Sequence, residues 1–132
     1  MLLKTLVRKL ESEFSSLRFT VDEEKHVVII PPIHEEIGSI EIEDDLNELI
    51  VIVGNFTHWH AGCYREELSD IERSEAVAED VVGFLHDLFN DKIVMWGSHK
   101  GGGGFTYRDN MQSQASYLGK HQKWLWSGLL SE

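Results

Sequence analysis

The chain has 132 residues, of which 42% are apolar and 27% charged, so it can form one folded domain spanning 1–132 and is not disordered by composition. Its net charge of −11 argues against a nucleic-acid binder. It has no apolar run near the about 18 residues that a membrane span needs, so no membrane association is expected. A single cysteine, Cys63, excludes an internal disulfide and favours a cytoplasmic protein.

The first predicted element is an amphipathic helix over residues 2–17, because leucine, valine and phenylalanine recur there at helical spacing. Residues 18–21 and 26–30 are expected to form a hairpin of two short strands. Two more strands are predicted at 39–43, where apolar and acidic residues alternate, and at 48–53, which is almost wholly apolar. The last of these is typical of a central strand.

Residues 54–68 are expected to form an irregular segment. A capping box at 69–72 then begins a second helix, which runs to about Asn90. Two further strands are predicted at 92–96 and 105–108. This part of the chain therefore adds one helix and one hairpin to the fold.

The glycines from Gly101 to Gly104 favour a hairpin turn rather than a phosphate-binding loop, since Lys100 precedes them and a strand follows. The last predicted element is an amphipathic helix over about 110–130, weakened by Gly119 and Gly128. The whole order predicts one α+β domain, with a mostly antiparallel sheet of about five to six strands and helices mainly on one face.

Acidic residues are concentrated in the middle of the chain. Residues 35–80 hold fourteen of them against only Arg65 and Arg73, whereas the flanking segments are close to neutral. A one-sided field of this kind speeds association with a basic partner. A surface that merely keeps the protein in solution explains the same pattern.

Two binding functions fit this charge better than catalysis does. In its acidity the chain resembles the immunity proteins of bacterial toxin systems, which neutralise basic nucleases by presenting carboxylates where phosphates would lie. In its order of elements it is similar to secretion chaperones that act as homodimers. We therefore expect a bacterial-type protein-binding module with a basic protein partner. The residues expected to bind that partner are all acidic: Glu41, Glu43, Asp44, Asp45, Glu48, Glu72 and Glu75.

A third interpretation is a small metal-dependent enzyme. His58 and His60 project to the same side of an extended chain, so two imidazoles could hold Zn²⁺, with Cys63 or a carboxylate as the third ligand. Cys63 beside His60 would also suit a thiol nucleophile with its base. A loop that covers the sheet edge, with Cys63 as a small buried hydrophobe, accounts for the same residues without a cofactor. No cofactor is therefore predicted.

Three tryptophans, Trp59, Trp124 and Trp126, form a candidate aromatic interface. Trp124 and Trp126 are two residues apart and cannot share one face of a helix. We therefore expect one of them to meet a partner, a second copy or another part of the fold, since tryptophan is favoured at interface hot spots.

Overall fold

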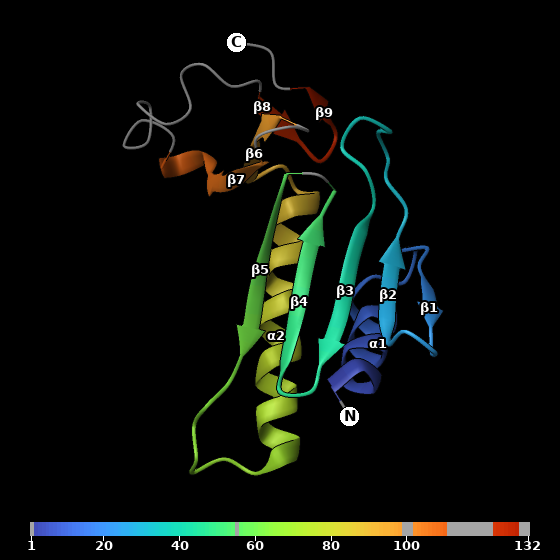
Figure 1. The fold of residues 1–132 in the computed structure, drawn as a ribbon, viewed down its shortest axis with the longest axis vertical. Coiled ribbons are helices and arrows are strands. Elements are labelled where there is room, and N and C mark those ends of the chain that lie inside the picture. Colours follow the sequence, from blue (N-terminus) through green and yellow to red (C-terminus); the bar gives the residue numbers. More distant parts are fainter. Residues whose placement is uncertain (1, 55, 99–101, 111–122, 130–132) are drawn as a thin grey trace.

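The computed structural model describes residues 2–54, 56–98, 102–110 and 123–129. These residues form two α-helices, nine strands and one short 3₁₀-helix (Figure 1). In chain order they are α1 (Leu2–Glu13), β1 (Thr20–Asp22), β2 (Val27–Ile30), β3 (Ile40–Asp45), β4 (Glu48–Val53), β5 (Thr57–Gly62), α2 (Asp70–Phe89), β6 (Ile93–Ser98), β7 (Gly102–Tyr107), the 3₁₀-helix (Arg108–Asn110), β8 (Lys123–Leu125) and β9 (Gly128–Leu129). No described helix is long and apolar enough to cross a membrane.

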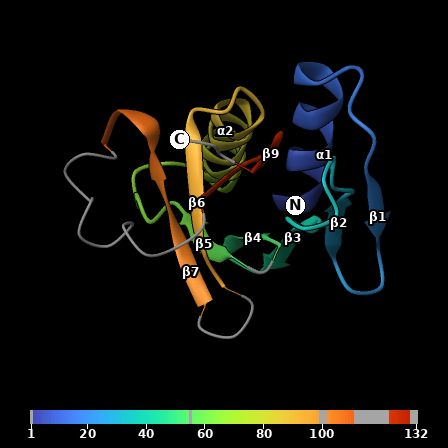
Figure 2. The ribbon, with the colours of Figure 1, turned by 90° about the horizontal axis from the view of Figure 1, so that it is seen from above.

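The strands divide between two sheets. Strands β1 to β5 form an antiparallel sheet in which each strand pairs with the next along the chain. The second sheet has the order β7-β6-β8-β9 and lies near the C-terminal end of α2, with β7 beside β5 (Figures 1 and 2). The predicted α+β fold with a largely antiparallel sheet is confirmed, although its strands belong to two sheets rather than one.

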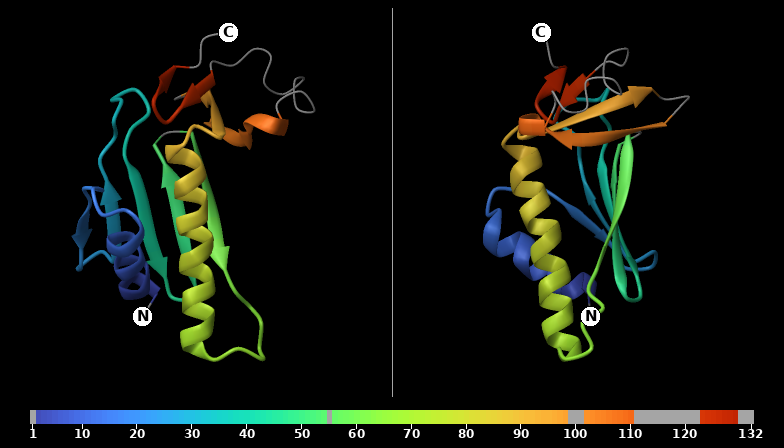
Figure 3. Two further views of the ribbon diagram at one scale, coloured as in Figure 1. Left: turned by 180° about the vertical axis from the view of Figure 1, so that it is seen from behind. Right: turned by 90° about the vertical axis from the view of Figure 1, so that its left-hand side faces the viewer.

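The core lies between the larger sheet and the two helices. Figure 3 shows α1 and α2 on the same face of that sheet. Alternate residues of β3 and β4 point toward the helices and are buried, whereas the residues between them remain partly or fully exposed. The fully buried side chains between the sheet and the helices include Leu6, Leu10, Ile40, Ile42, Leu49, Val51, Val53, Val81, Leu85 and Leu88.

Helix α2 begins with the predicted capping box. The Ser69 hydroxyl accepts a hydrogen bond from the Glu72 N–H at 3.1 Å, and the Glu72 carboxylate accepts one from the Ser69 N–H at 3.1 Å. The pKa of Glu72 is lowered below its ordinary value. The main cause is the hydrogen bond from the Ser69 backbone, and the side-chain hydrogen bond with Ser69 contributes less. A lowered pKa means that the carboxylate stabilises the fold at neutral pH and that this contribution is lost as acid protonates Glu72.

Replacing Ser69 with alanine is expected to lower the free energy of unfolding by about 1 kcal/mol, because an N–H group at the start of α2 loses its partner. Ser12→Ala is the matched control, since Ser12 is exposed near the end of α1 and alanine is the better helix former. Urea denaturation of both variants measures the difference. Equal stabilities for the two variants would show that the cap contributes nothing.

Two predictions about loops need correction. Residues 57–62, expected to be irregular, form β5 and pair with β4 along their whole length. Gly102 to Gly104, expected to form a turn, belong to β7. A methyl group on Gly104 would lie 2.8 Å from the ring of Trp96, its partner across the hairpin, so this glycine makes room for an indole. Gly101, the remaining residue of the predicted turn, lies outside the described residues.

The predicted C-terminal helix is also wrong where the chain is described. Residues 123–129 form a hairpin of β8 and β9, and 111–122 lie outside the described residues. Trp124 pairs with Met95 of β6. The turn is held by Asp91, which accepts hydrogen bonds from the Ser127 N–H at 3.2 Å and hydroxyl at 2.7 Å. These long-range contacts outweigh the local helical pattern. In addition, α1 ends at Glu13, earlier than predicted.

Candidate functional site

The face of the larger sheet opposite the helices carries the candidate site. No described helix covers this face, as Figure 3 shows. Its side chains come from the outward-pointing positions of three neighbouring strands, and we call this surface the open face. Its members are Glu41, Glu43 and Asp45 on β3, Glu48, Ile50 and Ile52 on β4, and His58 and His60 on β5.

Strand register sorts the open face into three parallel columns. Glu43 lies opposite Ile50, which lies opposite His60. In the neighbouring row across the three strands, Glu41 lies opposite Ile52, which lies opposite His58. In these two rows, carboxylates occupy β3, branched apolar side chains occupy β4, and imidazoles occupy the edge strand β5. The face combines charge, apolar area and a possible ligand set within three adjacent strands.

The three outward-pointing carboxylates of β3 are not neutralised within the described part of the chain. Among those residues, the side chains of Glu41, Glu43 and Asp45 take part in no hydrogen bond or ion pair. Asp45 also lies directly opposite Glu48 in the register. Side chains at these positions are close neighbours, so their like charges repel one another and create a negative potential over the sheet. A cationic group placed here would relieve that repulsion.

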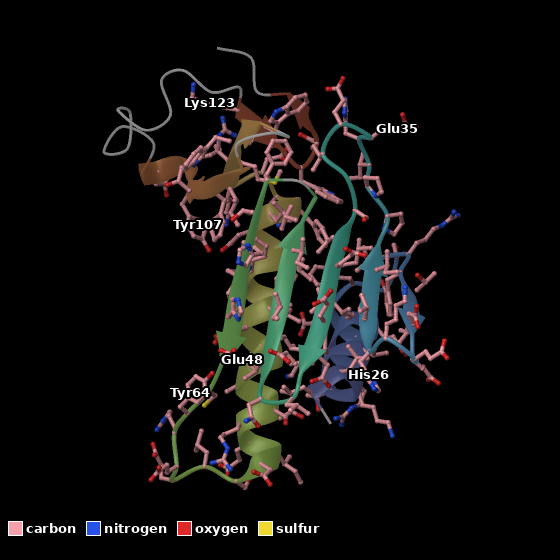
Figure 4. All side chains as sticks on the ribbon, viewed as in Figure 1. His26, Glu35, Glu48, Tyr64, Tyr107 and Lys123 are labelled. Carbon is pink, nitrogen blue, oxygen red and sulfur yellow. The ribbon has the colours of Figure 1, made fainter. Side chains whose placement is uncertain are left out.

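Glu48 differs from the other acids because it has two partners. The Tyr64 hydroxyl donates a hydrogen bond to Oε2 at 2.6 Å, and His60 Nδ1 lies 3.4 Å from Oε1. Figure 4 shows Glu48 and Tyr64 near each other at the lower end of the sheet. The hydrogen bond from Tyr64 and the contact with His60 lower the pKa of Glu48, and the same carboxylate raises the pKa of Tyr64. Glu48 is therefore a fixed anion that orients a histidine.

The other three predicted acidic residues lie elsewhere and stabilise the helices. Asp44 accepts a hydrogen bond from the Leu3 N–H at 3.3 Å at the start of α1. Glu72 completes the capping box of α2. Glu75 forms an ion pair with Lys9 at 2.9 Å, which joins the two helices. Four of the seven predicted acids are thus brought together on the open face, and three are not.

The structure separates Cys63 from the two histidines. His58 and His60 are exposed on β5 with ring centroids 5.7 Å apart, whereas Cys63 packs against the core and lines a cavity with Leu2 and Val77. Strand alternation is the reason, because odd- and even-numbered residues of this segment point to opposite sides. Within the described residues, no three His, Cys, Asp or Glu side chains are grouped to hold a metal ion. Neither the three-ligand zinc site nor a Cys63–His60 nucleophile pair is assembled.

The three tryptophans of the candidate interface pack against other residues of the same chain. Trp124 and Trp126 are buried, at 7% and 3% exposure. The Trp59 ring packs against Phe84 of α2 with centroids 5.2 Å apart, and Trp126 packs against Phe89 at 5.7 Å. Of the outcomes expected for Trp124 and Trp126, contact with another part of the fold is the one observed. Trp59 is partly buried, and all three rings pack within the fold rather than forming one exposed aromatic surface.

Sequence reasoning missed the apolar part of the site. Strand β4 is apolar on both sides, so its pattern indicates complete burial, yet Ile50 and Ile52 remain half-buried on the open face. Tyr64 was missed because it follows the strand in a loop, where no periodicity marks it. The alternation of Glu41 and Glu43 with isoleucines and the placement of His58 and His60 on one side were the sequence signals for the open face.

No protein-family model, curated protein or solved structure matches this chain. Functional proposals for the protein therefore depend on the geometry of its own residues.

Proposed function

We propose that the protein is a binding module that recognises a basic protein through the open face, as an inhibitor of the immunity type does. The observation that carries this proposal is the juxtaposition of four carboxylates with two half-buried isoleucines on the sheet face that no described helix covers. Three of these carboxylates, those of Glu41, Glu43 and Asp45, have no partner among the described residues.

Each part of the open face has a role in such a complex. The negative potential attracts a basic surface and speeds its approach, and it also repels nucleic acid. Ile50 and Ile52 offer apolar area that a partner can shield from water, as the centre of a protein interface does. The carboxylates of β3 lie beside these isoleucines, so lysine or arginine side chains of the partner would meet them once the apolar contact forms.

The inhibitor is favoured over the two other candidate functions. A chaperone that dimerises through α1 would need an exposed apolar stripe on this helix, whereas Leu2, Leu3, Leu6 and Leu10 are buried against the protein's own sheet. A metal-dependent enzyme needs three converging ligands, and the described residues do not supply such a group. The open face, by contrast, already presents its carboxylates at the surface.

Reversing three charges tests the proposal. In the variant Glu41→Lys/Glu43→Lys/Asp45→Lys, association with a basic partner is expected to slow by at least about tenfold at low salt. The difference should shrink as salt screens both fields. The partner is first retained from extracts of the native host on immobilised wild-type protein, and its association rate is then measured by surface plasmon resonance. If it is a nuclease, its activity is assayed with and without the inhibitor.

The matched control is Glu11→Lys/Glu66→Lys/Asp80→Lys. It changes the net charge by the same amount but alters exposed residues outside the open face. This variant is expected to keep most of the association rate. Equal slowing in both variants would assign the effect to total charge, and an acidic or salt-insensitive partner would refute the proposed function.

A further inference from the structure

We propose that His58 and His60 form a two-histidine chelate for a divalent transition metal that prefers imidazole, Zn²⁺ or Cu²⁺, with Glu48 as the residue that orients His60. This site is independent of the proposed inhibitor function. It also differs from the three-ligand site expected from the sequence, because Cys63 has no part in it.

The backbone holds the two imidazoles in a fixed relation. Both residues lie on the outward side of β5, which pairs with β4 at His58–Ile52 and at His60–Ile50. Both histidines are exposed, and their ring centroids are 5.7 Å apart. Residues two apart on one paired strand keep their Cα–Cβ bonds on the same side of the sheet, so the two imidazoles stay within reach of each other. A metal ion that binds between the rings therefore finds two ligands that the sheet has already placed.

Glu48 gives His60 the tautomer that metal binding requires. Its Oε1 lies 3.4 Å from His60 Nδ1, and an ionised carboxylate only accepts hydrogen bonds, so this contact favours the tautomer with the proton on Nδ1 and the lone pair on Nε2. Carboxylates that hold a histidine in this way are common behind metal ligands, where they fix the ring and raise its basicity. The Tyr64 hydroxyl, 2.6 Å from Oε2, holds the carboxylate in turn.

The chemistry of the site selects the class of metal. Imidazole nitrogen suits Zn²⁺, Cu²⁺ and Ni²⁺, whereas Mg²⁺ and Ca²⁺ prefer shells of oxygen ligands. The negative potential of the open face raises the local concentration of cations. Two protein nitrogens leave coordination positions for water or for a ligand from another molecule. The site is therefore an open chelate and not a closed structural centre.

Titration of the 132-residue protein without a polyhistidine tag tests the site. Isothermal titration calorimetry with Zn²⁺ alone and with Cu²⁺ alone is expected to show one saturable site per chain, and Mg²⁺ is expected not to compete. Electron paramagnetic resonance of the Cu²⁺ complex is expected to show coupling to two imidazole nitrogens. Competition between the two metals identifies which one binds more tightly.

Variants separate this site from other histidines. His58→Gln and His60→Gln should each weaken binding by at least about tenfold, and the double variant should lose the site. Glu48→Gln should weaken binding by about 10- to 100-fold while two nitrogens remain bound, as expected for an orienting residue. The control His26→Asn/His86→Gln removes two histidines on other elements and should bind normally. Unchanged stoichiometry and affinity in the His58/His60 double variant would overturn the proposal.

Discussion

Replacing Leu85 with alanine is expected to lower the free energy of unfolding by about 2–5 kcal/mol. Leu85 is fully buried on the face of α2 that packs against the larger sheet. Removing its side chain leaves a cavity. The surrounding helix and sheet are rigid and can close it only in part, so the cavity adds its cost to that of the lost apolar burial. Urea or guanidinium denaturation measures the effect.

Ile71→Ala provides the matched control for this substitution. Ile71 lies in the same helix, but its side chain is 65% exposed. Its truncation is expected to change stability by no more than about 0.5 kcal/mol. A loss at Leu85 no larger than that at Ile71 would mean that α2 does not pack on the sheet as described.

Replacing Gly54 with alanine is expected to destabilise the protein by about 2–4 kcal/mol. Gly54 follows β4 with φ +52°, and its N–H donates a hydrogen bond to Ser39 O at 2.8 Å. A methyl group there would lie 1.6 Å from the carbonyl oxygen of Ile37, which belongs to the backbone and cannot rotate away. The connection between β2 and β3 would have to shift.

At Gly83, replacement by alanine should change the stability in the opposite direction. Gly83 is exposed in α2, and no atom lies within 4 Å of the position its methyl group would take. Gly83→Ala is therefore expected to stabilise the protein by about 0.5–1 kcal/mol through helix propensity. Thermal unfolding of the two variants compares them directly. A stabilising effect at Gly54 would contradict its close approach to Ile37.

The parts of the fold that the sequence predicts are those governed by local rules. The capping box at Ser69 and the apolar spacing of the second helix identify α2, because both depend on residues a few positions apart. Alternation in β3 identifies a strand with one wet face. The C-terminal hairpin was not predicted, since Asp91 and Ser127 are 36 residues apart and their contact leaves no local pattern.

In the candidate site, too, features that depend on local pattern were predicted and features that depend on tertiary contacts were not. Neighbouring acids in the sequence suggested one surface, but Asp44 points to the opposite face of the sheet from Glu43 because strand side chains alternate. Glu75 joins the two helices through Lys9, a pairing that follows from tertiary packing. His58 and His60 were predicted to share one side, and the structure confirms this arrangement. Glu48, the partner of His60, belongs to another strand and could be found only from the folded structure.

The strand order of the larger sheet has a consequence for how the chain folds. Each strand pairs with the next one along the chain, so the sheet forms through short loops, whose closure costs little entropy. The two helices meet across a much longer separation, as Lys9 and Glu79 are 70 residues apart. Contacts between residues close in sequence form faster than distant ones. We therefore expect the transition state for folding to contain the meander around β3 and β4, with the docking of α1 on α2 as a later event.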